Sequence, residues 1–335
     1  MNIRKSLPRL LQDFFCVHLI AQRDLSQNTV YAYRDTIVLL LRFAAVRAQR
    51  DVATLEFVHL DRDVVLGFLN DLENGRGNSV RTRNARLAAI HSFFRYVAAE
   101  EPACIALCRA VLGIPFKRGV DATVTCLDRM EIEHLLALPD RTNRAGRRDA
   151  AAFWFLYNTG ARAQELVDVR IRAVRFSPPE QVRIFGKGRK ERLCPLWPET
   201  VTLLHDMIRD RGINEESDEP LFLNAAGRPL SRFGLRHIVR TYAVRAAETC
   251  PSLATKRISP HTFRHTTALH LLQNGVELNV VRSWLGHASI ETTHRYVEIN
   301  MEMKRAALAA ASPPSQQGWR PRWQEPNLLQ WLERL

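Results

Sequence analysis

The sequence predicts a mainly α-helical protein with a small antiparallel β-sheet, an α+β fold organised in two domains. Its 335 residues exceed the size at which a single hydrophobic core usually stops growing. Apolar residues recur at helical spacing along most of the chain. One stretch, VRIFGKGRKERLCPL, instead favours two short strands joined by a glycine-containing turn.

Two long helices are expected in the N-terminal third. The first begins after Ser26, a residue suited to the N-cap, and one face of it carries Val30, Tyr33, Ile37, Leu40, Leu41 and Ala44. The second covers residues 78–97, with Leu87, Ile90, Phe94 and Val97 on its apolar face. Arg81 and Arg95 point roughly to the opposite side. A solvated helix face is the common explanation for such arginines, and contact with a polyanion is the alternative.

The domain boundary is expected where helical periodicity lapses, between Glu101 and Thr125. Prolines, glycines and basic residues are frequent in this stretch, as in a linker. We therefore expect four segments: a helical N-terminal domain over residues 1–110, a basic linker over 111–124, a larger domain over 125–302 and a C-terminal tail over 303–335.

The larger domain begins with a helix that Asp128 and Glu131 can cap from both sides. Two further helices meet at Gly160, two strands flank the turn over residues 186–189, and the remainder is helical between glycines and prolines. In the tail, the leucines and tryptophan after Pro326 make a short amphipathic helix, which suits docking on its own chain or on a neighbouring subunit.

The composition favours a polyanionic partner. Lys and Arg number 48 against 35 Asp and Glu, which gives a formal net charge of +13. Such a charge suits nucleic acid, and a basic surface without a specific partner is the alternative. No apolar stretch is long enough to span a bilayer, so we expect a cytoplasmic protein that does not act at a membrane. Six cysteines without a CxxC pair indicate reduced, mostly buried thiols rather than disulfides or a structural zinc site.

Residues typical of phosphate chemistry occur in short stretches of the second half. In TGARAQEL, Gly160 ends one helix, Arg162 begins the next, and Glu165 lies one turn later on the same face. The carboxylate can therefore orient the guanidinium toward a phosphate, although a surface salt pair is the simpler alternative. In GKGRKER, Lys187 lies at the predicted turn, where it can donate a proton to a leaving group or merely discourage edge pairing.

The stretch SPHTFRHTTALHLL gives the clearest signal. Ser259 can cap a helix and Pro260 suits its first position. His261, Arg264 and His265 then share one face at the positive end of that helix, a favourable place for a phosphate. A metal site formed by the two histidines is the competing interpretation, but the glutamate of HExxH is missing and no third ligand is evident.

The remaining candidates lie near the C-terminal end. Gly286 can end a helix and leaves His287 in the following loop, and Tyr296 lies on the next expected helix. A helix-borne tyrosine is usually a packed core residue. Only the basic residues that accompany Tyr296 make it a candidate nucleophile.

In this order and spacing, the residues resemble those of the tyrosine recombinase and phage integrase family. The set comprises Arg162 with Glu165, Lys187, His261-x-x-Arg264, Leu285-Gly286-His287 and Tyr296. Tyr296 follows His287 by 9 residues and Lys187 follows Arg162 by 25, separations similar to those of Xer-type members. Ala161 and Gln164 depart mildly from the family pattern. The N-terminal helices resemble the SAM-like core-binding domain of small Xer-like enzymes, and the Trp-rich tail looks more like recombinases of transposons and other mobile elements.

The resemblance implies a site-specific DNA recombinase or integrase that cuts and rejoins strands through a 3′-phosphotyrosine, without metal or cofactor. The catalytic residues it implies are Arg162, Lys187, His261, Arg264, His287 and the nucleophile Tyr296, with Glu165 in support. The two arginines would hold the scissile phosphate, the lysine would be the general acid, and the histidines would assist. The side chains expected to contact DNA are Arg81, Arg83, Arg86, Lys117, Arg118, Arg189 and Lys190.

The resemblance also implies how the parts work together. A helical core-binding domain and a recombinase catalytic domain would form a C-shaped clamp around double-stranded DNA. Four copies would act on two recombination sites as a homotetramer, alone or with sister recombinases, each passing its C-terminal segment to the next subunit. Two alternatives are a catalytically silent DNA-binding accessory subunit and strand nicking and closing like that of a type IB topoisomerase. A metal-dependent nuclease is disfavoured because the clustered carboxylates it needs are missing.

Overall fold

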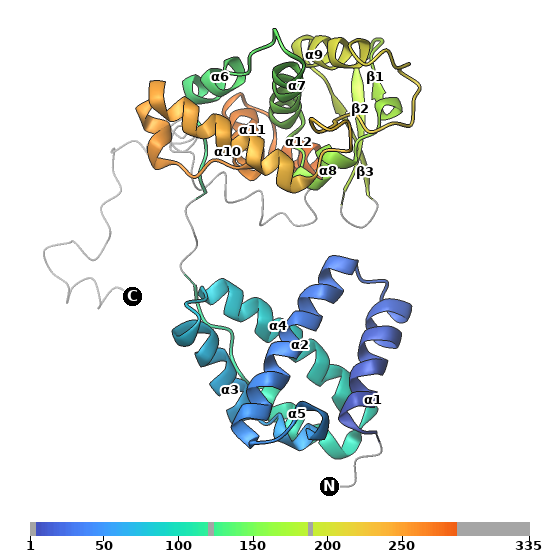
Figure 1. Cartoon of the computed structure of the whole chain (residues 1–335), viewed down its shortest axis with the longest axis vertical. Helices are drawn as coiled ribbons and strands as arrows, with labels where there is room; N and C mark the ends of the chain where they lie inside the picture. Colours follow the sequence, from blue (N-terminus) through green and yellow to red (C-terminus); the bar gives the residue numbers. More distant parts are fainter. Residues whose placement is uncertain (1–4, 120–123, 187–189, 287–335) are drawn as a thin grey trace, which may run out of the picture. The chain divides into compact units, whose positions relative to one another are not determined.

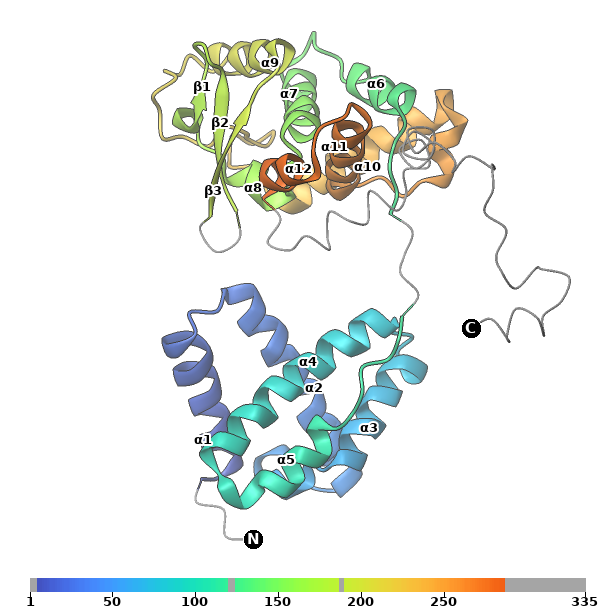
Figure 2. The same cartoon turned by 180° about the vertical axis from the view of Figure 1, so that it is seen from behind.

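The computed structural model describes residues 5–119, 124–186 and 190–286, and the chain divides into two compact units, residues 1–122 and 123–335 (Figure 1, and from behind in Figure 2). The predicted fold class, mainly helical with a small antiparallel sheet, is confirmed. Among the described helices, none is long and apolar enough to cross a membrane. The predicted roles of Lys187, Arg189, His287 and Tyr296, and of the tail over residues 303–335, lie outside the described residues.

The first unit is built only of helices in its described part. They are α1 (Leu7–Gln12), α2 (Gln27–Ala48), α3 (Arg62–Asn70), α4 (Val80–Glu100) and α5 (Ile105–Leu112). Wider π-helical turns continue α1 over Asp13–Gln22 and α3 over Asp71–Gly75. The two predicted helices are confirmed as α2 and α4, which pack against each other.

Helix α4 forms the centre of the first unit because its apolar face is fully covered. Leu87, Ile90, Phe94 and Val97 are all completely buried, as the sequence spacing predicts. Ser79 caps the helix by accepting a hydrogen bond from the backbone N–H of Thr82 at 3.3 Å. The same core contains the predicted face of α2, through the buried side chains of Ile37, Leu40 and Ala44.

Helix α5 contradicts the expected lapse of structure between Glu101 and Thr125. Pro102 opens a short 3₁₀ turn, and α5 follows directly from it. Cys108, Val111 and Ile114 are buried in the core of the first unit, so the first residues of the expected linker belong to that core. A helix of eight residues is too short for its periodicity to stand out, and its stability comes from packing rather than from sequence propensity.

The second unit surrounds one central helix. Its elements are α6 (Arg129–Ala137), α7 (Arg144–Thr159), α8 (Ala163–Asp168), β1 (Val174–Arg175), β2 (Gln181–Phe185), β3 (Glu191–Pro195), α9 (Pro198–Arg209), α10 (Arg232–Thr249), α11 (Pro260–Gln273) and α12 (Leu278–Leu285). Helix α7 packs against α9 on one side and α11 on the other. The predicted capping box of α6 is present, with both hydrogen bonds between Asp128 and Glu131 at 2.8 Å.

The small sheet has the order β1-β2-β3, with both pairs antiparallel. The predicted hairpin is confirmed as β2 and β3, whereas β1 was not expected. Val182 lies opposite Cys194 in the register, and both are completely buried. All six cysteines are free, but the expectation that most are buried holds for only three, because Cys16 is exposed and two others are half-buried.

Gly160 ends α7 where this helix meets the start of α8 and the end of α12. Its φ of 58° lies in the left-handed region, which a residue with a side chain adopts only at a cost. A Cβ atom at this position would lie 2.4 Å from Cδ2 of Leu285, the last residue of α12. Both the backbone conformation and the close approach of α12 therefore require glycine.

We expect Gly160→Ala to lower the free energy of unfolding of the second unit by about 2 to 4 kcal/mol, from left-handed strain and overpacking together. The matched control is Gly212→Ala, since Gly212 has a φ of 64° and nothing within 4 Å of the added Cβ. The control should lose only about 1 to 2 kcal/mol. Denaturant unfolding followed by tryptophan fluorescence measures this unit selectively, because residues 1–122 contain no tryptophan. Equal losses for the two variants would contradict the packing argument.

Candidate active site

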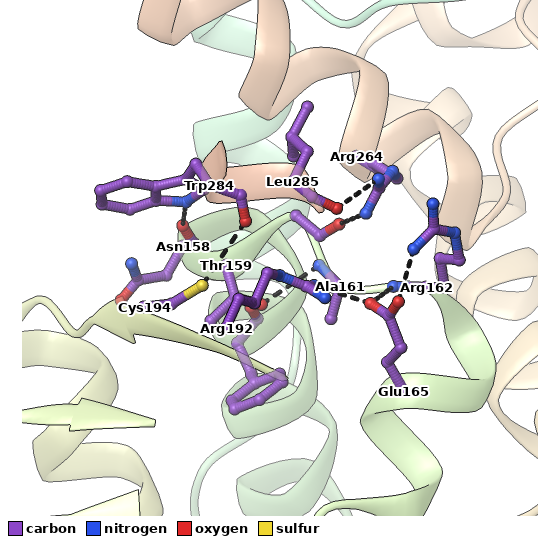
Figure 3. Close-up of polar contacts among 12 residues, drawn as sticks. Asn158, Thr159, Ala161, Arg162, Glu165, Arg192, Cys194, Arg264, Trp284 and Leu285 are labelled. Atoms are coloured by element: carbon purple, nitrogen blue, oxygen red, sulfur yellow. Dashed lines mark hydrogen bonds and ion pairs between the residues drawn. The ribbon is translucent and has the colours of Figure 1, made fainter. Parts of the chain in front are cut away.

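The centre of the site is a carboxylate held between two arginines (Figure 3). Arg162 occupies the N-cap position of α8, and its Nη1 donates to Oε1 of Glu165 at 2.6 Å. Its backbone N–H donates to Oε2 at 2.9 Å. From strand β3, Nη2 of Arg192 donates to the same Oε2 at 2.7 Å. The Arg162 side chain remains 33% exposed, whereas those of Glu165 and Arg192 are 4% and 8% exposed, so only Arg162 is open to a ligand.

The electrostatics of this cluster keep Glu165 ionised. Burial by itself raises the pKa of a carboxyl group, but the hydrogen bonds and charges of Arg192 and Arg162 outweigh burial and hold the pKa of Glu165 below its usual range. The alternative of a surface salt pair therefore does not describe this interaction, because the carboxylate is buried and has two guanidinium partners.

Arg264 on α11 is buried and joins the ends of two other helices. Its Nη1 donates to the carbonyl oxygen of Gly160 at 2.7 Å, and its Nη2 donates to that of Leu285 at 2.6 Å. Carbonyl groups at helix C-termini lack partners within the helix, so a fixed guanidinium satisfies two of them at once. The predicted helix start is confirmed, with Ser259 and Thr262 forming a capping box and Pro260 at the first position.

His261 lies one turn before Arg264 and is surrounded by positive charge. Desolvation by the neighbouring protein, together with the guanidiniums of Arg264, Arg162 and Arg236, lowers the pKa of its imidazole. At neutral pH the ring is therefore mainly uncharged and able to accept a proton. Arg264, Arg162 and Arg236 are thus all within electrostatic reach of this imidazole.

A basic groove lies beside His261. Helix α10 carries exposed arginines at every fourth position, namely Arg232, Arg236 and Arg240. Arg236 and Arg240, with Arg257 from the segment before α11, line a groove of about 780 Å³. Spacing of four residues places such side chains on one helix face, so the groove presents a row of cations next to the site.

The structure brings together the described members of the predicted catalytic set: Arg162, Glu165, His261 and Arg264. Of the predicted DNA-contacting residues, Arg81, Lys117, Arg118 and Lys190 are exposed. Arg86 is half-buried, with its Nη1 donating to Oγ1 of Thr36 at 3.4 Å.

Arg83 departs from its predicted role. Its side chain is buried, and its Nε lies 3.3 Å from a carboxylate oxygen of Glu73. The reason is helical geometry, because Arg83 precedes Leu87 by four residues and therefore continues the buried face of α4. The four-residue spacing from Leu87 is visible in the sequence and could have predicted this burial. The guanidinium faces Glu73 in the interior rather than the surface of α4.

Sequence reasoning missed two features of the site. Arg192 gave no signal, since its partner Glu165 is 27 residues away in the chain. The arginines of α10 did give one, because their four-residue spacing is visible in RFGLRHIVRTYAVR. That spacing could have been read as a basic helix face.

The comparisons with known proteins agree with this arrangement. Residues 125–303 match the model of the phage integrase family, and residues 13–101 match that of the phage integrase N-terminal SAM-like domain. The chain belongs to the phage integrase family. A Sinorhizobium fredii protein named as an integrase/recombinase, y4rC, is 41% identical over the full length of both chains. Tyrosine recombinase XerD of Staphylococcus haemolyticus is 33% identical, covering 83% of this chain and 90% of that protein.

Solved structures of the same family share the fold of this tyrosine recombinase. The Tn1549 transposon integrase in complex with circular intermediate DNA has a TM-score of 0.68 at 15% identity, covering 89% of this chain and 98% of that one. The XerH site-specific recombinase bound to a palindromic difH substrate has a TM-score of 0.66 at 20% identity, covering 86% of this chain and 81% of that one. The family model and the relatives at 33 to 41% identity confirm the predicted family and class of enzyme, a site-specific recombinase, and the solved structures share its fold.

Proposed function

We propose that this recombinase cleaves and rejoins double-stranded DNA through a 3′-phosphotyrosine formed at Tyr296, in the service of a mobile element. The observation that carries the proposal is that Arg162 and Arg264 lie near each other (Figure 3), with His261 within electrostatic reach of both and a basic groove beside them. Two guanidiniums suit the nonbridging oxygens of a phosphodiester. The Tn1549 and XerH structures, both solved with DNA, support DNA as the partner. We propose that the protein acts in the cytoplasm.

The steps follow from the chemistry of phosphoryl transfer. The phenolic oxygen of Tyr296 attacks phosphorus and the 5′-oxygen leaves, so the bond energy is kept in the phosphotyrosine and rejoining needs no further energy source. Arg162 meets the phosphate oxygens at the surface, and the fixed positive charge of the buried Arg264 beneath it helps to neutralise the charge that develops on them. His261, uncharged at neutral pH, accepts the tyrosine proton, Lys187 protonates the leaving oxygen, and His287 donates to the phosphate.

Tyr296→Phe should abolish covalent protein–DNA adducts while leaving DNA affinity near that of the wild type, because only the attacking oxygen is removed. A suitable substrate is a duplex nicked beside the scissile phosphate, built on a site selected by the wild-type chain from random duplexes. Adducts are counted by denaturing electrophoresis and affinity by mobility shift. An adduct that persists in the variant would refute the role of Tyr296.

DNA contact is proposed to extend beyond the catalytic residues. The N-terminal unit would act as the core-binding domain and, across the basic segment that follows its buried Ile114, form a C-shaped clamp with the catalytic domain over residues 125–302. Within that domain, the exposed arginines of α10 would contact DNA next to the scissile phosphate. Each cation that neutralises a phosphate releases condensed counterions, which makes binding weaken as salt rises.

Replacing Arg236 and Arg240 together by alanine should weaken DNA binding and reduce the slope of log affinity against log salt concentration by about two. Fluorescence anisotropy over a series of salt concentrations measures both quantities. Arg209→Ala is the matched control, since that arginine is 71% exposed on α9 and is paired with Asp206. An unchanged salt slope in the double variant would exclude these two phosphate contacts.

Strand exchange between two duplexes needs four active sites, and we propose a homotetramer on two recombination sites. The tail over residues 303–335 carries apolar side chains in its last segment, including Trp331, that suit packing on an adjacent subunit. Passing such a segment from one protomer to the next would join the four copies in a ring.

Deleting residues 316–335 should therefore weaken the assembly of two DNA sites more than binding to one site. Analytical ultracentrifugation or mass photometry of the chain with one-site and two-site DNA separates these effects. The single-site affinity of the same deletion serves as its internal control. Unchanged assembly on paired sites would count against a role of the tail between subunits.

A further inference from the structure

Arg192 divides the oxygens of Glu165 between two guanidiniums. On Oε2, the carboxylate accepts from Nη2 of Arg192 and from the backbone N–H of Arg162, at 2.7 and 2.9 Å. Only Oε1 accepts from the guanidinium of Arg162, through Nη1 at 2.6 Å. A carboxylate facing a single arginine usually binds it with both oxygens in a parallel, bidentate pair. Here that geometry is prevented, because Oε2 is already occupied.

We propose that Arg192 is a positioning residue for strand cleavage, which prevents Glu165 from binding Arg162 with both oxygens and so leaves the outer donors of Arg162 to the scissile phosphate. The inference rests on the proposed function, because it concerns the same site. Arg192 itself is buried and does not touch the substrate. It acts on the phosphate indirectly, through Glu165 and Arg162.

Arg192 also lies close to the backbone of two other segments of the site. A Cβ added to Gly286, which ends α12, would lie 3.3 Å from both Cδ and Nη1 of Arg192. A Cβ added to Gly186, at the end of β2, would lie 3.6 Å from Nη1 and 3.3 Å from Oε1 of Glu165. The two glycines directly precede His287 and Lys187 in the chain. The Arg192 side chain therefore lies close to the backbone at Gly186 and Gly286, and it also binds Glu165, the partner of Arg162.

Burial makes a purely structural explanation of Arg192 weak. Its Nε is buried and has no hydrogen-bond partner within the described residues. Burying a guanidinium that is not fully hydrogen-bonded is costly, and an apolar side chain of similar volume usually serves packing as well or better. The charge is useful at this position because it keeps Glu165 ionised and shared.

Because Arg192 keeps Glu165 ionised, its removal should change how the rate of cleavage depends on pH. The groups that interact with Glu165 are Arg162 on its own helix, Arg192 and Cys194 on β3, and His261 on α11. Burial raises the pKa of Glu165 and Arg192 is a main cause of its net lowering, so removing Arg192 raises that pKa relative to the wild type even though the hydrogen bonds of Arg162 remain. The carboxylate then becomes protonated as the pH falls through the raised value, and its hold on Arg162 is lost in the acidic range.

The test compares Arg192→Met, Arg192→Lys, Glu165→Gln and the double variant in the full chain. The substrate is the nicked duplex described above, and the readouts are the rate of covalent adduct formation at saturating DNA, DNA affinity, and the pH profile of the rate relative to the wild type. Arg175→Met is the matched control, because that arginine is exposed on β1 of the same sheet. Tryptophan fluorescence checks that each variant is folded.

We expect Arg192→Met to cleave up to about 100-fold more slowly, with affinity near that of the wild type and a deficit that grows as the pH falls. The cleavage rate of Arg192→Lys should lie between those of the wild type and Arg192→Met. The variant that combines Arg192→Met with Glu165→Gln should cleave no more slowly than the slower of these two single variants. If Arg192→Met does not fold, Arg192→Lys carries the test alone through its pH profile.

Three results would overturn the inference: wild-type rates in both Arg192 variants, a deficit that is the same at every pH, or effects of Arg192 and Glu165 that multiply in the double variant. Failure of the proposed function would look different. In that case the wild-type chain itself would form no adduct that depends on Tyr296.

Discussion

The second unit depends on one buried guanidinium. Arg264 donates to the last carbonyls of α7 and α12, at Gly160 and Leu285, and thereby fixes the C-terminal ends of two helices to α11. Helix C-termini carry partial negative charge, so their convergence favours a cation at this point. The close approach of these helix ends explains why glycine is required at position 160, and it places Arg162, two residues later, at the start of α8 beside Arg264.

The two arginines of the site are therefore held in different ways. Arg264 is buried and anchored on backbone carbonyls, whose positions depend on whole helices. Arg162 is one-third exposed and anchored on a side chain, so its orientation depends on what else binds Glu165. Phosphoryl transfer requires donors that are already oriented when charge develops, because reorganisation during the reaction would add to the barrier. Arg264 meets this requirement through the fold, and Arg162 meets it through the pair formed by Glu165 and Arg192.

What the sequence could predict was local. The capping residues before α6 and α11, the left-handed glycine after α7 and the apolar faces of α2 and α4 all follow from spacings of a few residues, and each is present. The prediction failed where distant segments decide the outcome. Helix α5 is stabilised by the core it joins, and Arg192 finds its carboxylate across 27 residues. Arg83 shows the opposite case, because its spacing from Leu87 indicated burial but its charge suggested a surface role.

The burial of Glu165 determines how much its ion pairs with Arg162 and Arg192 contribute to stability. Exposed pairs contribute about 0 to 1 kcal/mol, whereas removing one partner of a buried pair costs about 3 to 5 kcal/mol, because the other charge is left without compensation. Glu165 and Arg192 belong to the buried class and Arg162 does not. Of the two positive charges in the cluster, one is therefore neutralised inside the protein by the carboxylate, and the remaining charge resides at the only exposed group. A dianionic transition state that approaches this surface therefore meets a cation whose charge is not cancelled, because Arg192 already balances the carboxylate in the interior.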